Sequence, residues 1–140
     1  MNNLITLEQY VGTWKDSPDW TSERQTAAIF LLSKVSDLEA EMIADGVVFP
    51  DNPKTGSGVS GEVYGGFRPQ SCPIGKTNSH HKEGQAVDRY DPDNRIDMWC
   101  MAHQPRLREY WIFIEHPDST PHWSHWQSIA PSSGKTVFRP

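Results

Sequence analysis

Apolar residues recur at intervals of three and four positions between residues 22 and 45, and charged residues occupy most of the opposite face. This spacing gathers apolar side chains along one side of a helix. Gly46 follows directly and is a typical helix stop. The pattern predicts an amphipathic helix over 22–45 that packs through Ala28, Leu31, Leu32, Val35, Leu38 and Met42.

Two short segments predict helix starts. Thr6-Leu7-Glu8-Gln9 and Ser22-Glu23-Arg24-Gln25 both fit the capping box, in which a hydroxyl accepts from the third following N–H and the Gln side chain returns a hydrogen bond. The N-terminal part, about residues 1–46, is therefore expected to be helical.

Beyond residue 46 the chain becomes rich in Pro, Gly, Asn and Ser, which predicts loops around short β-prone pieces at 47–49, 59 and 62–64. Further patterns predict strands at 86–90, 111–115 and 123–129, a helix over 93–104 stopped by Pro105, and a surface tail over the last ten residues. The expected class is α+β, with a small antiparallel sheet over about 59–130 packed against N-terminal helices. The whole chain, 1–140, is expected to form one domain.

Composition narrows the classes of function. The 140 residues carry a net charge of −5 and no basic stripe, which argues against a nucleic-acid partner. No apolar run approaches the roughly 20 residues of a membrane span, and the first residues lack the features of a signal peptide, so we expect cytoplasmic synthesis and no membrane insertion. Cys72 and Cys100 are expected to be reduced, buried thiols, with a bridge between them left open.

All six histidines lie in residues 71–140, where acidic and basic groups balance. Within this half, the stretch from Ser79 to Asp88 holds a candidate metal site, because His81 offers nitrogen, Asp88 offers oxygen, and Gly84 permits a tight reversal between them. A catalytic zinc site uses three protein ligands and an open position. His125, in a short predicted strand between two Trp residues, is the candidate third ligand.

Alternation along the predicted strand 86–90 would place Asp88 on one face and Val87 in the core. If the segment before it is extended, His80 points away from a metal held by His81. His80 is therefore left out of the expected ligand set.

The motif Ser-x-His-x-x-Gly-x-Ala-x-Asp, with Gly-Phe-Arg-Pro upstream and Trp-x-His downstream, resembles the zinc D-alanyl-D-alanine carboxypeptidase and L-alanyl-D-glutamate peptidase family. That family shares its fold with the hedgehog signalling domain. The resemblance spans 65–127 and rests on Phe67, Arg68, Pro69, Ser79, His81, Gly84, Ala86, Asp88 and His125. It implies one zinc ion per chain held by His81, Asp88 and His125, with Arg68 and Ser79 at the substrate site, where Arg68 holds a carboxylate or carbonyl.

The chain departs from the family at the catalytic base. Many relatives place Glu or Asp three residues before the final ligand, a position that His122 occupies here. A neutral imidazole can accept a proton near pH 7, so His122 is the predicted acid/base. Asp118 in the same loop is the fallback, and Glu115 is a further nearby acid.

The resemblance implies a zinc metallopeptidase, a hydrolase that cleaves D-amino-acid-containing bonds in the stem peptide of bacterial peptidoglycan. It favours a monomeric, endolysin-like protein of phage or prophage origin that reaches the cell wall after release, for instance through a holin-type pore, or as part of a virion. The alternative is a non-catalytic zinc-binding member that serves as a phage structural or wall-binding protein.

Overall fold

The long helix expected from the apolar stripe is present. In the computed structural model, which describes residues 5–61, 65–74 and 79–140, α2 spans Ser22–Ala44 and all six residues of the stripe are buried. The helix begins at Ser22, but its N-cap is Thr21, whereas the predicted capping box required Ser22. The side chain of Thr21 accepts from the Arg24 backbone N–H, because Thr21 is the last residue with extended backbone.

A second, short helix precedes it. α1 spans Leu7–Val11, and its predicted capping box is confirmed: Thr6 accepts from the Gln9 N–H, while the Gln9 side chain accepts from the Thr6 N–H. A 3-10 turn, η1 at Gly12–Trp14, follows. The Tyr10 hydroxyl donates to the Ala86 carbonyl at 2.7 Å, which ties this helix to the first strand of the sheet.

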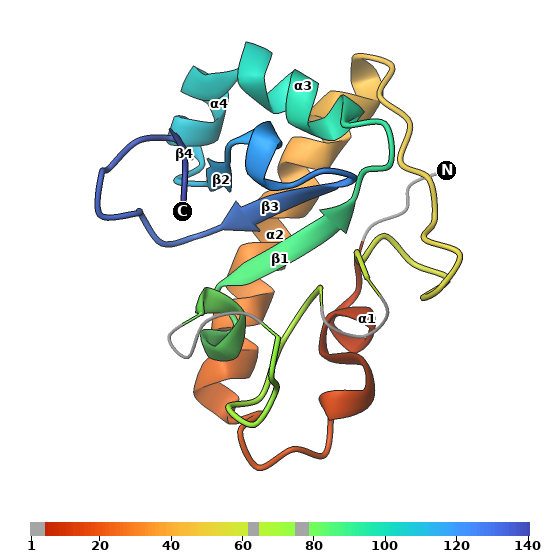
Figure 1. Cartoon of the computed structure of the whole chain (residues 1–140), viewed down its shortest axis with the longest axis vertical. Helices are drawn as coiled ribbons and strands as arrows, with labels where there is room; N and C mark the ends of the chain where they lie inside the picture. The colour runs from red at the N-terminus through yellow and green to blue at the C-terminus, as the bar shows by residue number, and fades with distance from the viewer. Residues whose placement is uncertain (1–4, 62–64, 75–78) are drawn as a thin grey trace.

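Four strands form one sheet in the order β1-β3-β2-β4, with bounds Ala86–Tyr90, Trp123–Gln127, Phe113–Glu115 and Val137–Phe138 (Figure 1). The β1–β3 and β2–β3 pairs are antiparallel, but β4 pairs with β2 in parallel. The α+β class is confirmed, whereas the expectation of a purely antiparallel sheet was wrong. The last ten residues are half-buried or exposed, as expected of a surface tail, but two of them pair as β4. The C-terminal segment pairs with a strand edge that would otherwise leave backbone groups exposed.

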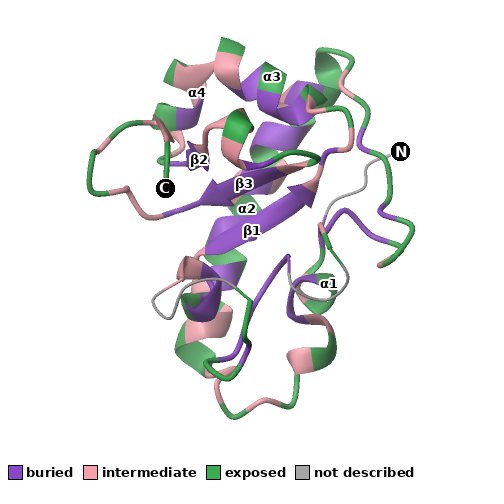
Figure 2. Cartoon of the chain, in the orientation of Figure 1, coloured by how far each residue is buried: buried purple, intermediate pink, exposed green. Residues whose placement is uncertain are grey.

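The sheet has two chemically different faces. Val87, Trp126 and Ile114 lie on the face that packs against α2 and are fully buried. Figure 1 shows α2 running behind the sheet, and Figure 2 shows β1 and β3 buried along most of their length. On this face Arg89 forms an ion pair with Glu39 of α2 at 3.2 Å. The opposite face is left to carry polar side chains.

The helix predicted over 93–104 is present as α3, Arg95–Ala102, and a second, unpredicted helix, α4 at Gln104–Glu109, follows it. Pro105 lies in the first turn of α4 instead of stopping a helix, because its missing N–H is not needed there. Trp111 adopts a positive φ of 55°, so β2 begins two residues later than predicted.

The β-prone piece at 47–49 forms no strand, and Val59 makes only an isolated bridge with Arg89. The piece at 62–64 lies outside the described residues. Both cysteines are buried and free. Within the described ranges, none of the helices has the length and apolar character that crossing a bilayer requires.

Candidate metal centre

Three neighbouring strands bring two carboxylates and an imidazole to the polar face of the sheet. Asp88 on β1 is the register partner of His125 on β3. Glu115, the last residue of β2, places its Oε2 3.5 Å from His125 Nδ1. Strand alternation explains the arrangement, since Val87, next to Asp88, points into the core as predicted.

A tight turn before β1 brings in the second imidazole. Ser79 caps the 3-10 helix η2, His80–Glu83, by accepting from the His81 N–H. Gly84 then reverses the chain with φ 73°. A Cβ at Gly84 would lie 2.5 Å from the Arg24 carbonyl oxygen of α2, so both the backbone conformation and the available space require glycine. This turn is what carries His81 back beside Asp88.

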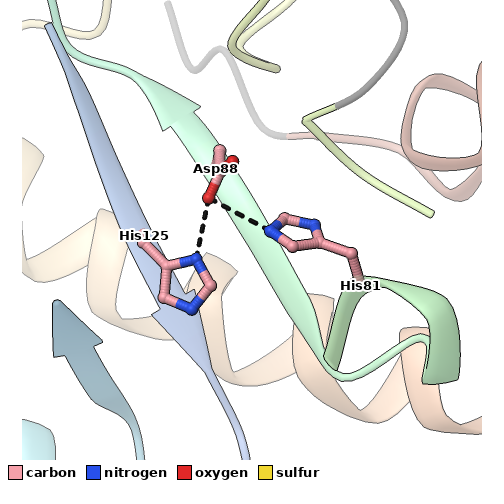
Figure 3. A group of neighbouring side chains, drawn as sticks. All are labelled: His81, Asp88 and His125. Atoms are coloured by element: carbon pink, nitrogen blue, oxygen red, sulfur yellow. Dashed lines mark hydrogen bonds and ion pairs between the residues drawn. The ribbon is translucent and has the colours of Figure 1, made fainter. Parts of the chain in front are cut away.

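His81, Asp88 and His125 converge on one point, and their ligand atoms all lie within 4.8 Å of one another. Asp88 Oδ1 is 3.3 Å from His81 Nε2 and 2.8 Å from His125 Nδ1. Figure 3 shows a nitrogen of each ring directed at the same oxygen of the Asp88 carboxylate. All three residues are buried, with 3%, 9% and 6% exposure in chain order. Sequence residues 81, 88 and 125 thus form a triad that could hold a metal ion.

The backbone of the Gly-Phe-Arg-Pro segment fixes the orientation of His81. His81 Nδ1 lies 2.8 Å from the Gly66 carbonyl oxygen, which can only accept, so Nδ1 carries the proton of the ring. The lone pair on His81 Nε2 then faces Asp88. Gly66 is held in turn by α1: Phe67 N donates to Tyr10 O at 3.0 Å, and a Cβ at Gly66 would overlap that same oxygen.

The electrostatics favour the protonation states of metal ligands at His81 and Asp88, but a protonated ring at His125. Burial lowers the pKa of His81, against the attraction of Asp88, so that the ring is neutral. Burial alone would raise the pKa of Asp88, but the two histidines outweigh it and hold that pKa well below its usual range. For His125, burial is likewise outweighed, here by Asp88 and Glu115, and the pKa is raised.

The donor set fits a three-ligand zinc site. Two imidazole nitrogens and one carboxylate oxygen are typical ligands, and ligands at about 2.0–2.1 Å from a tetrahedral zinc ion lie about 3.3 Å from each other. The separations of 2.8 and 3.3 Å around Asp88 Oδ1 are close to this spacing. The triad lines a pocket of about 720 Å³, which gives a ligand access to the remaining side.

Both residues expected at the substrate site, Arg68 and Ser79, line this pocket. Arg68 is 7% exposed, and its Nη2 donates to Asp88 Oδ2 at 3.2 Å. The guanidinium therefore holds the carboxylate of a candidate ligand, a contact that the sequence did not predict. Ser79 has a local role as well, because it caps the turn that positions His81.

The three acid/base candidates separate clearly. Glu115 lines the pocket, whereas His122 and Asp118 are not among its lining residues in the described part of the chain. His122 is exposed, has φ 76°, and its Nδ1 lies 3.1 Å from the Pro92 carbonyl. Asp118 is 71% exposed and pairs with Arg139. Of the three residues, Glu115 alone borders the pocket in the described part of the chain, and the acid/base roles of all three stay predictions.

Further residues line the pocket beside the predicted ones. His80 lines the pocket, because it lies in a 3-10 turn where the extended-chain argument does not apply. Trp123 also lines it, while Trp126 is fully buried. Gln127 and Phe138 were missed: strand alternation from His125 could have indicated Gln127, but nothing in the sequence places the C-terminal segment at this pocket.

Comparisons of the chain with protein-family models, with curated proteins and with solved structures gave no match. The family link therefore rests on the residues and motifs of the chain itself.

Proposed function

We propose that this protein is a zinc peptidase acting on D-amino-acid-containing peptides of bacterial peptidoglycan. The observation that carries the proposal is the convergence of His81, Asp88 and His125 within 4.8 Å in a pocket that also holds Glu115. The resemblance of the surrounding motif to the family of D-alanyl-D-alanine carboxypeptidases and L-alanyl-D-glutamate peptidases supplies the substrate class.

In this proposal His81 Nε2, Asp88 Oδ1 and His125 Nδ1 hold the ion. When bound, zinc would supply a Lewis acid that polarises a peptide carbonyl and makes a water molecule more acidic. The chain contributes a rigid set of donors: a backbone carbonyl orients His81, and Arg68 orients Asp88. Such contacts to the ligand side chains fix their geometry before substrate arrives.

Glu115 is the proposed general base and acid. Its Oε2 lies 3.5 Å from His125 Nδ1, and its side chain is 21% exposed, so it borders both the triad and the pocket space. A carboxylate there can accept a proton from the attacking water and return it to the leaving amine. The proposal thus gives Glu115 the role that the sequence suggested for His122.

The pocket is suited to a short peptide. Its volume of about 720 Å³ lies within the roughly 300–1,000 Å³ of small-molecule sites. Arg68 borders it and is proposed to bind a substrate carboxylate or carbonyl, since a guanidinium matches either group geometrically. Trp123 and Phe138 supply apolar walls.

The test combines metal analysis with mass spectrometry of muropeptides. Protein purified without chelator is expected to contain about one zinc per chain and to convert muropeptides into products whose masses identify the cleaved bond. His81→Ala should lose both metal and activity. His103→Ala is the matched control, since His103 stacks on Trp99 away from the triad.

Absence of zinc or a similar divalent ion from the wild type would refute the proposed centre. Metal binding without turnover of any wall substrate would instead support the alternative, a non-catalytic zinc-binding protein that is part of a phage particle or binds the cell wall.

A further inference from the structure

Gln127 connects His125 to the backbone beyond the end of β3. Its Oε1 lies 2.7 Å from His125 Nε2, and its Nε2 donates to the Ile129 carbonyl oxygen at 2.7 Å. The residue is 3% exposed and follows His125 by two positions in the same strand. Both side chains therefore lie on the polar face of the sheet, one beside the other.

The partners of the amide determine which atoms carry hydrogen. The Ile129 carbonyl can only accept, so the Gln127 atom facing it is the NH2 group. The remaining amide atom is then the oxygen, which also can only accept. His125 Nε2, 2.7 Å from that oxygen, must carry the proton of the ring.

The other nitrogen, Nδ1, faces Asp88 at 2.8 Å and Glu115 at 3.5 Å. A carboxylate oxygen can only accept, so without a metal ion Nδ1 carries a proton as well. A metal ion bound by the triad would replace the proton on Nδ1, while the Nε2 proton stays in its hydrogen bond to Gln127. Contacts at both ring nitrogens also restrict rotation of the ring. Without the amide oxygen, the single proton of the neutral ring could remain on Nδ1 and block the nitrogen that belongs to the triad.

We infer that Gln127 is a positioning residue that selects the tautomer and orientation of His125 and thereby sets the affinity of the centre for its metal. The inference rests on the metal centre proposed above and adds a residue outside the family motif. Removal of such outer contacts from histidine ligands typically weakens metal binding about 10–100-fold.

The test measures zinc affinity by competition with a chromophoric chelator. Gln127→Leu keeps the volume but offers no acceptor, and we expect its dissociation constant for Zn²⁺ to rise about 10–100-fold. Gln127→Glu keeps an acceptor at His125 Nε2 but loses the donor to the Ile129 carbonyl, so its dissociation constant is expected to lie between those of wild type and Gln127→Leu. Gln104→Leu is the control, because the Gln104 side chain donates to the nearby Met101 carbonyl of α3.

A spectroscopic readout keeps the inference testable even if Gln127→Leu fails to fold. In the zinc-loaded wild type, ¹⁵N NMR of His125 should show the proton on Nε2 and the metal on Nδ1, and the reverse assignment would overturn the inference. The Co²⁺-substituted Leu variant should likewise show an altered visible absorption spectrum. If wild type binds neither Zn²⁺ nor Co²⁺, the proposed centre itself fails; if wild type binds and Gln127→Leu binds equally tightly, only the role of Gln127 fails.

Discussion

Asp97 of α3 is buried and is hydrogen-bonded to β3 through Ser124, the residue before His125. It accepts hydrogen bonds from Ser124 Oγ at 2.6 Å and Thr120 Oγ1 at 3.2 Å. Ser124 Oγ in turn accepts from Trp126 Nε1 at 2.6 Å. Burial raises the pKa of Asp97 from 3.8 to about 6, against the effect of these hydrogen bonds.

The sign of the pH effect follows from the raised pKa. The folded protein binds the Asp97 proton more tightly than the unfolded chain does, so the unfolded chain releases it first as the pH rises. The contribution of Asp97 to the free energy of unfolding is therefore largest below about pH 4 and declines as the pH rises through about 6. A shift of about two units at about 1.4 kcal/mol each corresponds to about 3 kcal/mol.

The prediction compares urea unfolding, followed by Trp fluorescence, at several values between pH 4 and pH 7. The Asn side chain of Asp97→Asn cannot ionise. As the pH rises across the range, the free energy of unfolding of the wild type should therefore fall by about 3 kcal/mol relative to that of the variant. Any loss of hydrogen bonds in the variant adds a constant offset and leaves the slope difference intact. Asp93→Asn removes the same charge from an exposed position and is the control. Parallel pH profiles for wild type and Asp97→Asn would refute the reasoning.

Three further predictions concern the metal centre. In a muropeptide assay, Glu115→Gln should lower turnover by about 10²-fold or more with zinc retained; if His122→Ala shows that loss and Glu115→Gln does not, the acid/base role passes to His122. Arg68→Lys keeps the charge but not the planar fork, so binding of zinc and substrate should weaken, whereas a large drop in Tm with unchanged kinetics would assign Arg68 to the fold alone. The methyl group of Gly66→Ala would overlap the backbone of α1 and displace the Gly66 carbonyl that orients His81, so zinc affinity and Tm should both fall. Gly134→Ala, with no atom within 4 Å, should cost only about 1 kcal/mol of backbone strain, and equal Tm values for the two variants would contradict this.

Local sequence determined the elements whose physical causes are local. The stripe on α2 follows from helical periodicity, and the turn before β1 follows from Gly84 and its cap. The sequence indicated His81 and Asp88 as candidate ligands, because a tight turn and strand alternation can bring these two side chains together. His125 was a candidate third ligand that the family resemblance also implied, and the pairing of β1 with β3 is what places it beside Asp88.

Only the tertiary structure decided how the centre is supported. Glu115 lies nearer the triad than the sequence-favoured base, because the register of β2 on β3 brings it beside His125. Arg68 reaches Asp88 because its segment is hydrogen-bonded to α1 and to the His81 carbonyl. Local periodicity does not encode strand order, so the parallel pairing of the C-terminal strand and its place at the pocket were not predictable. The chain's own motif specifies which atoms can ligate a metal, whereas packing between distant segments specifies which groups hold those ligands in place.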